Sequence, residues 1–278
     1  MTSWLERRVL CYAHQGGARE GPSSTMWAMQ RAVAAGADAI ELDVHATADA
    51  QLVVCHDATV DRTTDGHGAI STLTLATLRS LDNAYWWVPG EVVAPGLADD
   101  AYVLRGHGLG IATLDEVLDA FPGVILNLDI KQTAPAVAPY EEAVARCLRE
   151  HGRRDGVIIA SFNDASTDAF RAVAPSIATS AGTLGVAAFW RAAHTGEPID
   201  PPPYQALQVP VRTAGVTVCD EVLVGTAHRS GIAVHVWTVD DPEEMARLIE
   251  LGVDGIITDV PSVAVGVIEG AGARWGRS

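Results

Sequence analysis

Short apolar runs alternate with helical patterns along almost the whole chain, and this alternation constrains the fold more than any other feature. Most of the runs are apolar throughout, as in parallel strands that are buried on both faces. Eight of them have the length and composition of strands: 9–13, 39–43, 124–129, 157–161, 177–180, 206–209, 232–238 and 255–258. Between them lie five helical patterns, over 24–36, 138–152, 164–174, 220–231 and 241–252. Strand followed by helix, repeated, is the pattern of βαβ units.

Eight such units favour a closed (β/α)₈ TIM barrel of the α/β class over an open, doubly wound sheet. The first strand runs into "HQGG", which lacks the G-x-G-x-x-G turn of dinucleotide-binding folds. A chain of 278 residues with 48% hydrophobic content can bury the core that a barrel needs. We therefore expect a single barrel domain over residues 1–278. Residues 60–113 interrupt the repeat between the second and third strands, and we expect them to form a lid-like insertion over the barrel mouth.

The charge balance excludes several kinds of partner. With 19 basic and 35 acidic residues, a net charge of −16 repels nucleic acids and anionic bilayers. The longest apolar runs are far shorter than the roughly 20 residues of a membrane-spanning helix. Glu6, Arg7 and Arg8 fall where a signal peptide would need its apolar stretch. These features predict a cytoplasmic chain that acts on a small molecule.

The cysteines and most of the histidines are expected to be structural. No C-x-x-C pair occurs among the four widely spaced cysteines, which argues against a zinc site and against a disulfide framework. The cysteines are Cys11, Cys55, Cys147 and Cys219. Seven histidines fall in predicted helices, loops or strand interiors, and the structural interpretation is favoured for each: His45, His67, His107, His151, His194, His228 and His235.

Three acidic residues stand at the ends of predicted strands. Glu41 and Asp43 lie two residues apart, so both side chains point to the same face of the second strand. Two buried like charges repel unless a cation compensates them. Asp129 ends the third strand, and barrel active sites gather at the carboxyl ends of strands. Three carboxylates suit a hard cation, so Glu41, Asp43 and Asp129 are predicted to hold one Mg²⁺ or Ca²⁺ ion.

Other polar residues at the same strand ends indicate chemistry on an anionic ester, of which a phosphate is the simplest. His14 follows the first strand, His56 follows the second, and Lys131 lies just beyond the third. Lysine and a metal ion would bind the anion, while two histidines with pKa values near neutrality would transfer protons. We predict His14 and His56 as catalytic residues and Lys131 as a substrate-binding residue. Trp237, at the end of the seventh strand, is expected to form a wall under the substrate.

Motifs that span nearly the whole chain strengthen this interpretation. They include "AHQGG", "ELDVHATADAQLVVCHDATVDRTTDGHG", "LNLDIK", "VHVWTVDD" and "GVDGIITDVP", in this order. Through them the sequence resembles the glycerophosphodiester phosphodiesterase family, whose members are (β/α)₈ barrels. The resemblance implies a metal-dependent hydrolase of lipid metabolism that cleaves glycerophosphodiesters to a glycerol phosphate and an alcohol, with a cyclic phosphate on the route. It places the family's catalytic histidines, metal ligands and phosphate-binding lysine on the residues already predicted.

Three positions depart from the family pattern. The usual His-Arg-Gly is His14-Gln15-Gly16 here, so Gln15 is expected to meet the substrate without the charge of an arginine. The usual Pro-Glu-Asn-Thr is the stretch 22–25, "PSST", which keeps a helix cap and loses a carboxylate. Asp129 replaces the usual Glu, as in the related sphingomyelinase D type phospholipases. These changes predict intact catalysis with altered substrate specificity.

Alternative functions remain open at this point. Aromatic residues of the insertion either pack as a lid or form an apolar groove for a lipid chain, which would make the enzyme a lysophospholipase D; they are Tyr85, Trp86, Trp87 and Tyr102. A barrel that binds phosphodiesters without cleaving them is a second alternative. A metal-free, sugar-processing barrel with Glu41 and Asp43 as its acid pair is a third.

Overall fold

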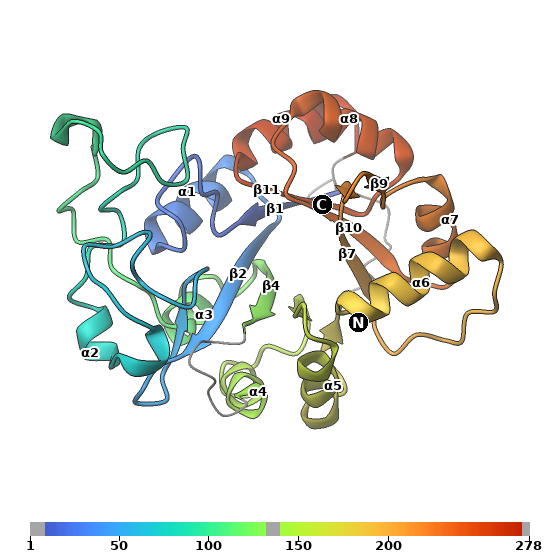
Figure 1. Ribbon diagram of the computed structural model, residues 1–278, viewed down its shortest axis with the longest axis horizontal. Helices are drawn as coiled ribbons and strands as arrows, with labels where there is room; N and C mark the ends of the chain where they lie inside the picture. The colour runs from blue at the N-terminus through green and yellow to red at the C-terminus, as the bar shows by residue number, and fades with distance from the viewer. Residues whose placement is uncertain (1–8, 132–139, 274–278) are drawn as a thin grey trace.

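The predicted TIM barrel is confirmed in a computed structural model that describes residues 9–131 and 140–273. Eight parallel strands make up the barrel in these residues (Figure 1). A parallel bridge between Ser180 and Ala206 joins the two ends of the sheet and closes it. Around the barrel the strands follow the order β6 (Ala178–Thr179), β5 (Val157–Ala160), β4 (Ile125–Ile130), β2 (Ala39–Ala46), β1 (Leu10–His14), β11 (Gly255–Thr258), β10 (Ala233–Trp237) and β7 (Ala206–Pro210).

Helices surround the barrel on its outer side (Figure 1). The five predicted helices are present, and α3, α6 and α9 complete the ring. The start of the helix predicted over 138–152 falls partly outside the described residues. The α-helices are α1 (Met26–Ala35), α2 (Leu75–Leu78), α3 (Leu114–Ala120), α4 (Glu141–Glu150), α5 (Asp164–Val173), α6 (Thr183–Thr195), α7 (Glu221–Arg229), α8 (Pro242–Leu251) and α9 (Pro261–Gly270).

Local sequence signals set the ends of several helices. The Thr25 side chain accepts a hydrogen bond from the Ala28 amide and caps α1, which ends at Gly36 with a left-handed φ of 102°. Asp241 caps α8 in the same way, and Gly252 ends it with φ 89°. Fixed helix ends of this kind give the connecting loops defined starting points, so the strand ends that carry the site are held in place.

Alternation along the strands separates an inner from an outer face. In β1, Cys11 and Ala13 pack in the core between the barrel and its helices, whereas Tyr12 belongs to a separate cluster inside the barrel. In β2, the outer face consists of Ile40, Leu42 and Val44. The residues between them, Glu41 and Asp43, therefore lie on the inner face.

A hairpin that the sequence did not predict extends β2 beyond the barrel. The strand β3 (Leu52–Val54) pairs antiparallel with the end of β2, with Val54 opposite Val44. A second, smaller hairpin follows β7 and is formed by β8 (Arg212–Thr213) and β9 (Val216–Thr217). Both hairpins lie at the carboxyl ends of barrel strands, where they can shape a site.

The segment 60–113 contains α2 and the 3₁₀ turns η1 (Ile70–Thr72) and η2 (Asp99–Ala101). It packs against the loop between β1 and α1: Trp87 donates its indole N–H to the Ala18 carbonyl at 3.0 Å, and Asn83 donates to the Ser23 carbonyl at 2.9 Å. In Figure 1 this cyan to green segment lies beside α1. Its contacts tie the first barrel loop to the rest of the molecule.

Two further expectations concern burial and membranes. All four cysteines are buried, as expected of small apolar residues. Among the described residues, no helix has the length and apolarity needed to cross a bilayer.

Candidate active site

Strand register brings the three predicted acids together on the inner face of the barrel. In the pairing of β2 with β4, Asp43 lies opposite Asp129 and Glu41 lies opposite Asn127. In the pairing of β1 with β2, His14 lies opposite Glu41. All these side chains line one cavity of about 620 Å³ at the carboxyl ends of the strands. The pattern that the sequence suggested, carboxylates on one face of a buried strand, is therefore present.

Lys131 forms ion pairs with both aspartates. Its Nζ lies 2.8 Å from Asp43 Oδ1 and 2.8 Å from Asp129 Oδ2. Burial lowers the pKa of Lys131, but the charges of the two aspartates outweigh burial and raise it above its usual range. The other two oxygens, Asp43 Oδ2 and Asp129 Oδ1, are buried with no hydrogen-bond partner among the described residues. Because buried carboxylate oxygens without partners are costly, this pair can accept a further cation.

Glu41 adds a third buried carboxylate beside this pair. Burial, followed by the charge of Asp43, raises the pKa of Glu41 to about 8. Burial likewise raises the pKa of Asp129. Glu41 has one hydrogen-bond partner of its own: its Oε2 accepts from the backbone N–H of Gln15 at 3.1 Å. Raised acid pKa values on one wall show that this wall has less positive charge than its carboxylates require.

A carboxylate orients the first predicted catalytic histidine. His14 donates from Nδ1 to Asp259 Oδ1 at 2.6 Å. Burial lowers the pKa of His14, but the hydrogen bond to Asp259 and the charge of Glu41 outweigh burial and raise it to about 9. The other ring nitrogen, Nε2, lies 3.9 Å from Glu41 Oε2 and 3.2 Å from the side-chain Nε2 of Gln15.

The second predicted histidine has the same arrangement. His56 follows β3 and donates from Nδ1 to Asp57 Oδ1 at 2.6 Å. Arg62 binds the same carboxylate through two hydrogen bonds, from Nε at 2.5 Å and from Nη2 at 3.1 Å. Burial raises the pKa of Asp57, but the bonds from His56 and Arg62 bring it below its usual range. The centroids of the His14 and His56 rings are 6.2 Å apart in an edge-to-face arrangement, so both rings can reach one small group in the cavity.

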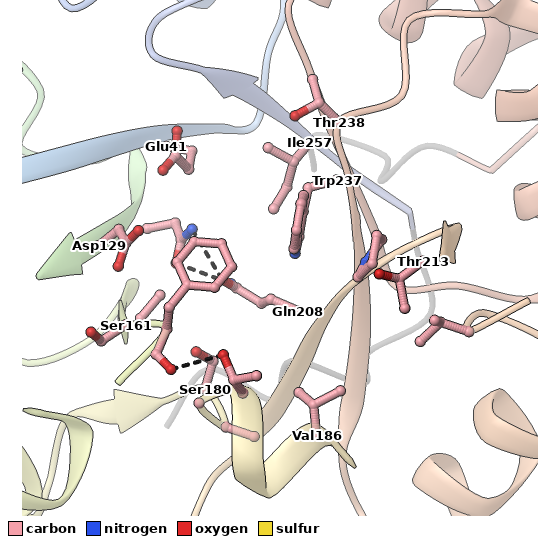
Figure 2. A pocket seen from close by; sticks show the side chains of 18 of the residues that line it. Glu41, Asp129, Ser161, Ser180, Val186, Gln208, Thr213, Trp237, Thr238 and Ile257 are labelled. Carbon is pink, nitrogen blue, oxygen red and sulfur yellow. Dashed lines mark hydrogen bonds between the residues drawn. The ribbon is translucent and has the colours of Figure 1, made fainter. Parts of the chain in front are cut away.

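The cavity has two different walls. Figure 2 shows Glu41 and Asp129 on one side, and Val186, Thr213 and Trp237 on the other. The second wall is formed by the first turns of α6 and by residues around the β8–β9 hairpin, and is mostly apolar. Its side chains include Phe162, Val186, Ala187, Trp190, Pro210, Val216, Val218 and Trp237. The site therefore combines an anion-binding end with an apolar end.

The two remaining predicted substrate-binding residues differ in placement. Trp237 lines the cavity and makes an edge-to-face contact with Phe162, at 5.5 Å between ring centroids. Gln15 is buried and does not line the cavity; its Oε1 accepts a hydrogen bond from Ser23 at 2.5 Å. Its backbone has a left-handed φ of 52°, and its side-chain Nε2 lies 3.2 Å from Nε2 of His14. In this structure Gln15 supports its neighbours His14 and Glu41 rather than facing the cavity.

Several polar residues at the site had no predicted role. Asp259 binds His14, and Arg62 binds the aspartate that holds His56. The sequence signals for these contacts were the aspartates of "CHD" and "ITD". Asn127 and Gln208 lie on opposite sides of the barrel and are joined by a hydrogen bond from Gln208 Nε2 to Asn127 Oδ1 at 3.0 Å. Figure 2 shows Gln208 in the middle of the cavity. Their spacing along the chain, 81 residues, hides this contact from sequence patterns.

Known proteins share both the sequence and the fold. The sequence model of the Glycerophosphoryl diester phosphodiesterase family matches residues 14–263. A glycerophosphodiester phosphodiesterase from Caldanaerobacter subterraneus is 33% identical, with 95% of this chain and 100% of that protein covered. The lysophospholipase D GDPD1 of Rattus norvegicus is 27% identical, with 93% and 85% covered. An Oleispira antarctica phosphodiesterase, solved with the product sn-glycerol-3-phosphate, is 23% identical, with a TM-score of 0.73 and 94% and 97% covered.

These similarities, together with the barrel, define a phosphoric diester hydrolase built on a TIM barrel. The chain belongs to the Glycerophosphoryl diester phosphodiesterase family, whose members generally depend on a divalent metal ion.

Proposed function

We propose that this enzyme cleaves glycerophosphodiesters to a glycerol phosphate and an alcohol, with His14 and His56 as its acid and base. The observation that carries the proposal is the pair of histidines, each held at Nδ1 by an aspartate at 2.6 Å and each lining the same cavity. A ring fixed in this way presents Nε2 for proton transfer. Two such rings on either side of a phosphodiester can serve the attacking and the leaving oxygen.

The carboxylates beside the histidines are of the ligand type that suits one divalent cation, although their oxygens do not all lie within 4.8 Å of one another. Glu41, Asp43 and Asp129 supply hard oxygen ligands, and two of their buried oxygens have no partner among the described residues. Mg²⁺ and Ca²⁺ prefer this ligand type. Bound there, the ion would stabilise negative charge on the phosphoryl oxygens. Lys131, already beside both aspartates, would bind a non-bridging oxygen of the same phosphate.

The nucleophile is proposed to be the glycerol hydroxyl next to the phosphate, because an intramolecular attack avoids the entropy of fixing a water molecule. One histidine accepts the hydroxyl proton as the new P–O bond forms. The other gives its proton to the head-group oxygen as that P–O bond breaks. The products are a cyclic phosphate and the alcohol, and addition of water with the two histidines in exchanged roles then opens the ring.

A substrate analogue tests this route directly. A glycerophosphodiester whose neighbouring hydroxyl is methylated should bind and compete with substrate, but should not release its head group, since the nucleophile is blocked. Removal of divalent ions with EDTA should abolish turnover of the unmodified substrate, and added Mg²⁺ or Ca²⁺ should restore it. Chromatography of the products checks both results. Rapid head-group release from the methylated compound would show that water attacks directly.

The apolar end of the cavity favours a second candidate function, that of a lysophospholipase D. It would release the head group from a lysophospholipid or lysoplasmalogen whose hydrocarbon chain lies along the apolar wall. Two large apolar side chains near this wall are unusually exposed, Phe162 at 59% and Leu184 at 75%. The insertion supplies none of the lining: no residue in 60–113, all described, lines the cavity. Instead, three of its aromatic rings pack around Arg105 within 5.3 Å, namely Tyr85, Trp86 and Tyr102.

Chain-length dependence separates the two functions. For a lysophospholipase D, kcat/KM should rise by roughly fourfold for each methylene buried on the wall, from about 0.8 kcal/mol per group. Val186→Glu should weaken long-chain substrates by at least roughly tenfold and leave glycerophosphocholine turnover unchanged. Val222→Glu is the matched control, because Val222 is exposed on α7 and does not line the cavity. A flat chain-length profile would exclude the apolar wall as a lipid site.

A further inference from the structure

A cluster of potential metal ligands lies outside the cavity, between α3 and α4. Asp115 and Asp119 are four residues apart on α3, and Cys147 and His151 are four residues apart at the end of α4. Residues with this spacing share one face of a helix. Two such pairs face each other across adjacent helices, and none of the four residues lines the cavity. In the described residues, Asp115, Cys147 and His151 are the group of three whose ligand atoms all lie within 4.8 Å of one another.

The distances within the cluster match the edges of a tetrahedron around a metal ion. Cys147 Sγ lies 3.4 Å from Asp115 Oδ1. His151 Nε2 lies 3.6 Å from the same oxygen and 3.3 Å from Asp119 Oδ1. Zinc bonds of about 2.0–2.2 Å to oxygen and nitrogen and about 2.3 Å to sulfur give tetrahedral edges of roughly 3.3–3.6 Å. Asp115, Cys147 and His151 therefore already lie close enough to share one ion, whereas Asp119 contacts His151 alone and would have to turn its exposed side chain toward the other two ligands.

The histidine already has the orientation that metal ligands use. His151 Nδ1 donates to the Cys147 carbonyl at 2.9 Å, which leaves Nε2 facing the two aspartates. A backbone carbonyl on the far nitrogen is the usual outer partner of a metal-bound imidazole.

We propose that Asp115, Asp119, Cys147 and His151 bind a borderline transition-metal ion of the Zn²⁺ class, which ties α3 to α4. A thiolate and an imidazole select such an ion over the hard cation expected in the cavity. On binding, the thiol proton passes to solvent and an S–metal bond forms. Cysteine spacing alone argued against a zinc site, but that rule concerns sites built on cysteine pairs, whereas this one combines one cysteine with histidine and aspartate.

Cobalt absorption provides a direct test on the full-length, metal-stripped enzyme in excess Mg²⁺. Added Co²⁺ should give a thiolate-to-cobalt charge-transfer band, which the all-oxygen cavity site cannot produce, and stoichiometric Zn²⁺ should remove the band. Cys147→Ala should abolish the band without changing turnover of glycerophosphodiesters. Asp119→Asn, at an exposed position, should weaken Zn²⁺ binding by at least about tenfold. Zn²⁺ should also raise the melting temperature of the wild type more than that of Cys147→Ala.

Cys219→Ala is the matched control, since Cys219 is also a buried free thiol and lies on the opposite part of the barrel wall, before α7. This variant should keep the band. Absence of a charge-transfer band in the wild type would overturn the proposal. A band that survives Cys147→Ala and disappears in Cys219→Ala would overturn it as well.

Discussion

An Asp43→Ala protein is expected to lose divalent-metal binding together with roughly 10³-fold or more of its kcat/KM. Asp43 lies opposite Asp129 in the strand register, and its Oδ2 is one of the two buried oxygens with no partner in the described chain. Charge stabilisation by a metal ion contributes several kcal/mol to a transition state, and about 1.4 kcal/mol corresponds to a factor of ten. Calorimetric titration with Mg²⁺ and Ca²⁺, alongside steady-state kinetics, measures both losses.

The variant should still fold, because Lys131 keeps its contact with Asp129 at 2.8 Å. Asp254→Ala is the matched control. Asp254 is also a largely buried aspartate, paired with His228 at 2.9 Å, but it precedes β11 at the opposite end of the barrel. It should lower stability and leave metal affinity unchanged. Full activity in Asp43→Ala would eliminate the proposed metal site.

Replacing either histidine of the pair by alanine should lower kcat by roughly 10²- to 10⁴-fold on natural substrates, the usual contribution of a general acid or base. The two variants should differ with a p-nitrophenyl phosphodiester, whose leaving group needs no proton. The variant that lacks the general acid should recover much of its activity, whereas the variant that lacks the base should not. Comparison of both substrates therefore assigns His14 and His56 to their roles.

His228→Gln serves as the control for these variants, because His228 also binds an aspartate, Asp254, at 2.9 Å and does not line the cavity. It should retain full kcat on both substrates. Equal losses on both substrates in the His14 and His56 variants would argue against separate acid and base roles.

The barrel could be predicted because each of its strands is a short apolar run that the local sequence reveals. Even β6, which has two residues, falls within the predicted run 177–180. The helices α6 and α9 could not be predicted in this way. Neither has a side-chain cap, and each contains an internal glycine, Gly185 in α6 and Gly266 in α9. Packing of residues such as Phe189 against the barrel supplies their stability instead of local signals.

In the candidate site too, the placements that depend on local sequence could be predicted, and those that depend on long-range contacts could not. Glu41, Asp43 and Asp129 could be placed together for two reasons. Side chains alternate between the two faces of a strand, and parallel strands bring their carboxyl ends to the same end of the barrel. The partner of His14 could not, since Asp259 is 245 residues away along the chain. Gln15 was assigned to substrate from its place in a motif, and this role stays a prediction; its side chain contacts His14 and Ser23.

The hairpin of β2 and β3 has a consequence for how this site can change. One histidine, His14, ends a barrel strand, whereas His56 is carried by an appendage whose antiparallel pairing lies outside the closed sheet. The Cys55 N–H donates to the Asp43 carbonyl at 3.0 Å, so the hairpin holds His56 beside the strand that carries Glu41 and Asp43. A change in the pairing of β2 with β3 would therefore move His56 relative to His14 while the closed barrel stays the same.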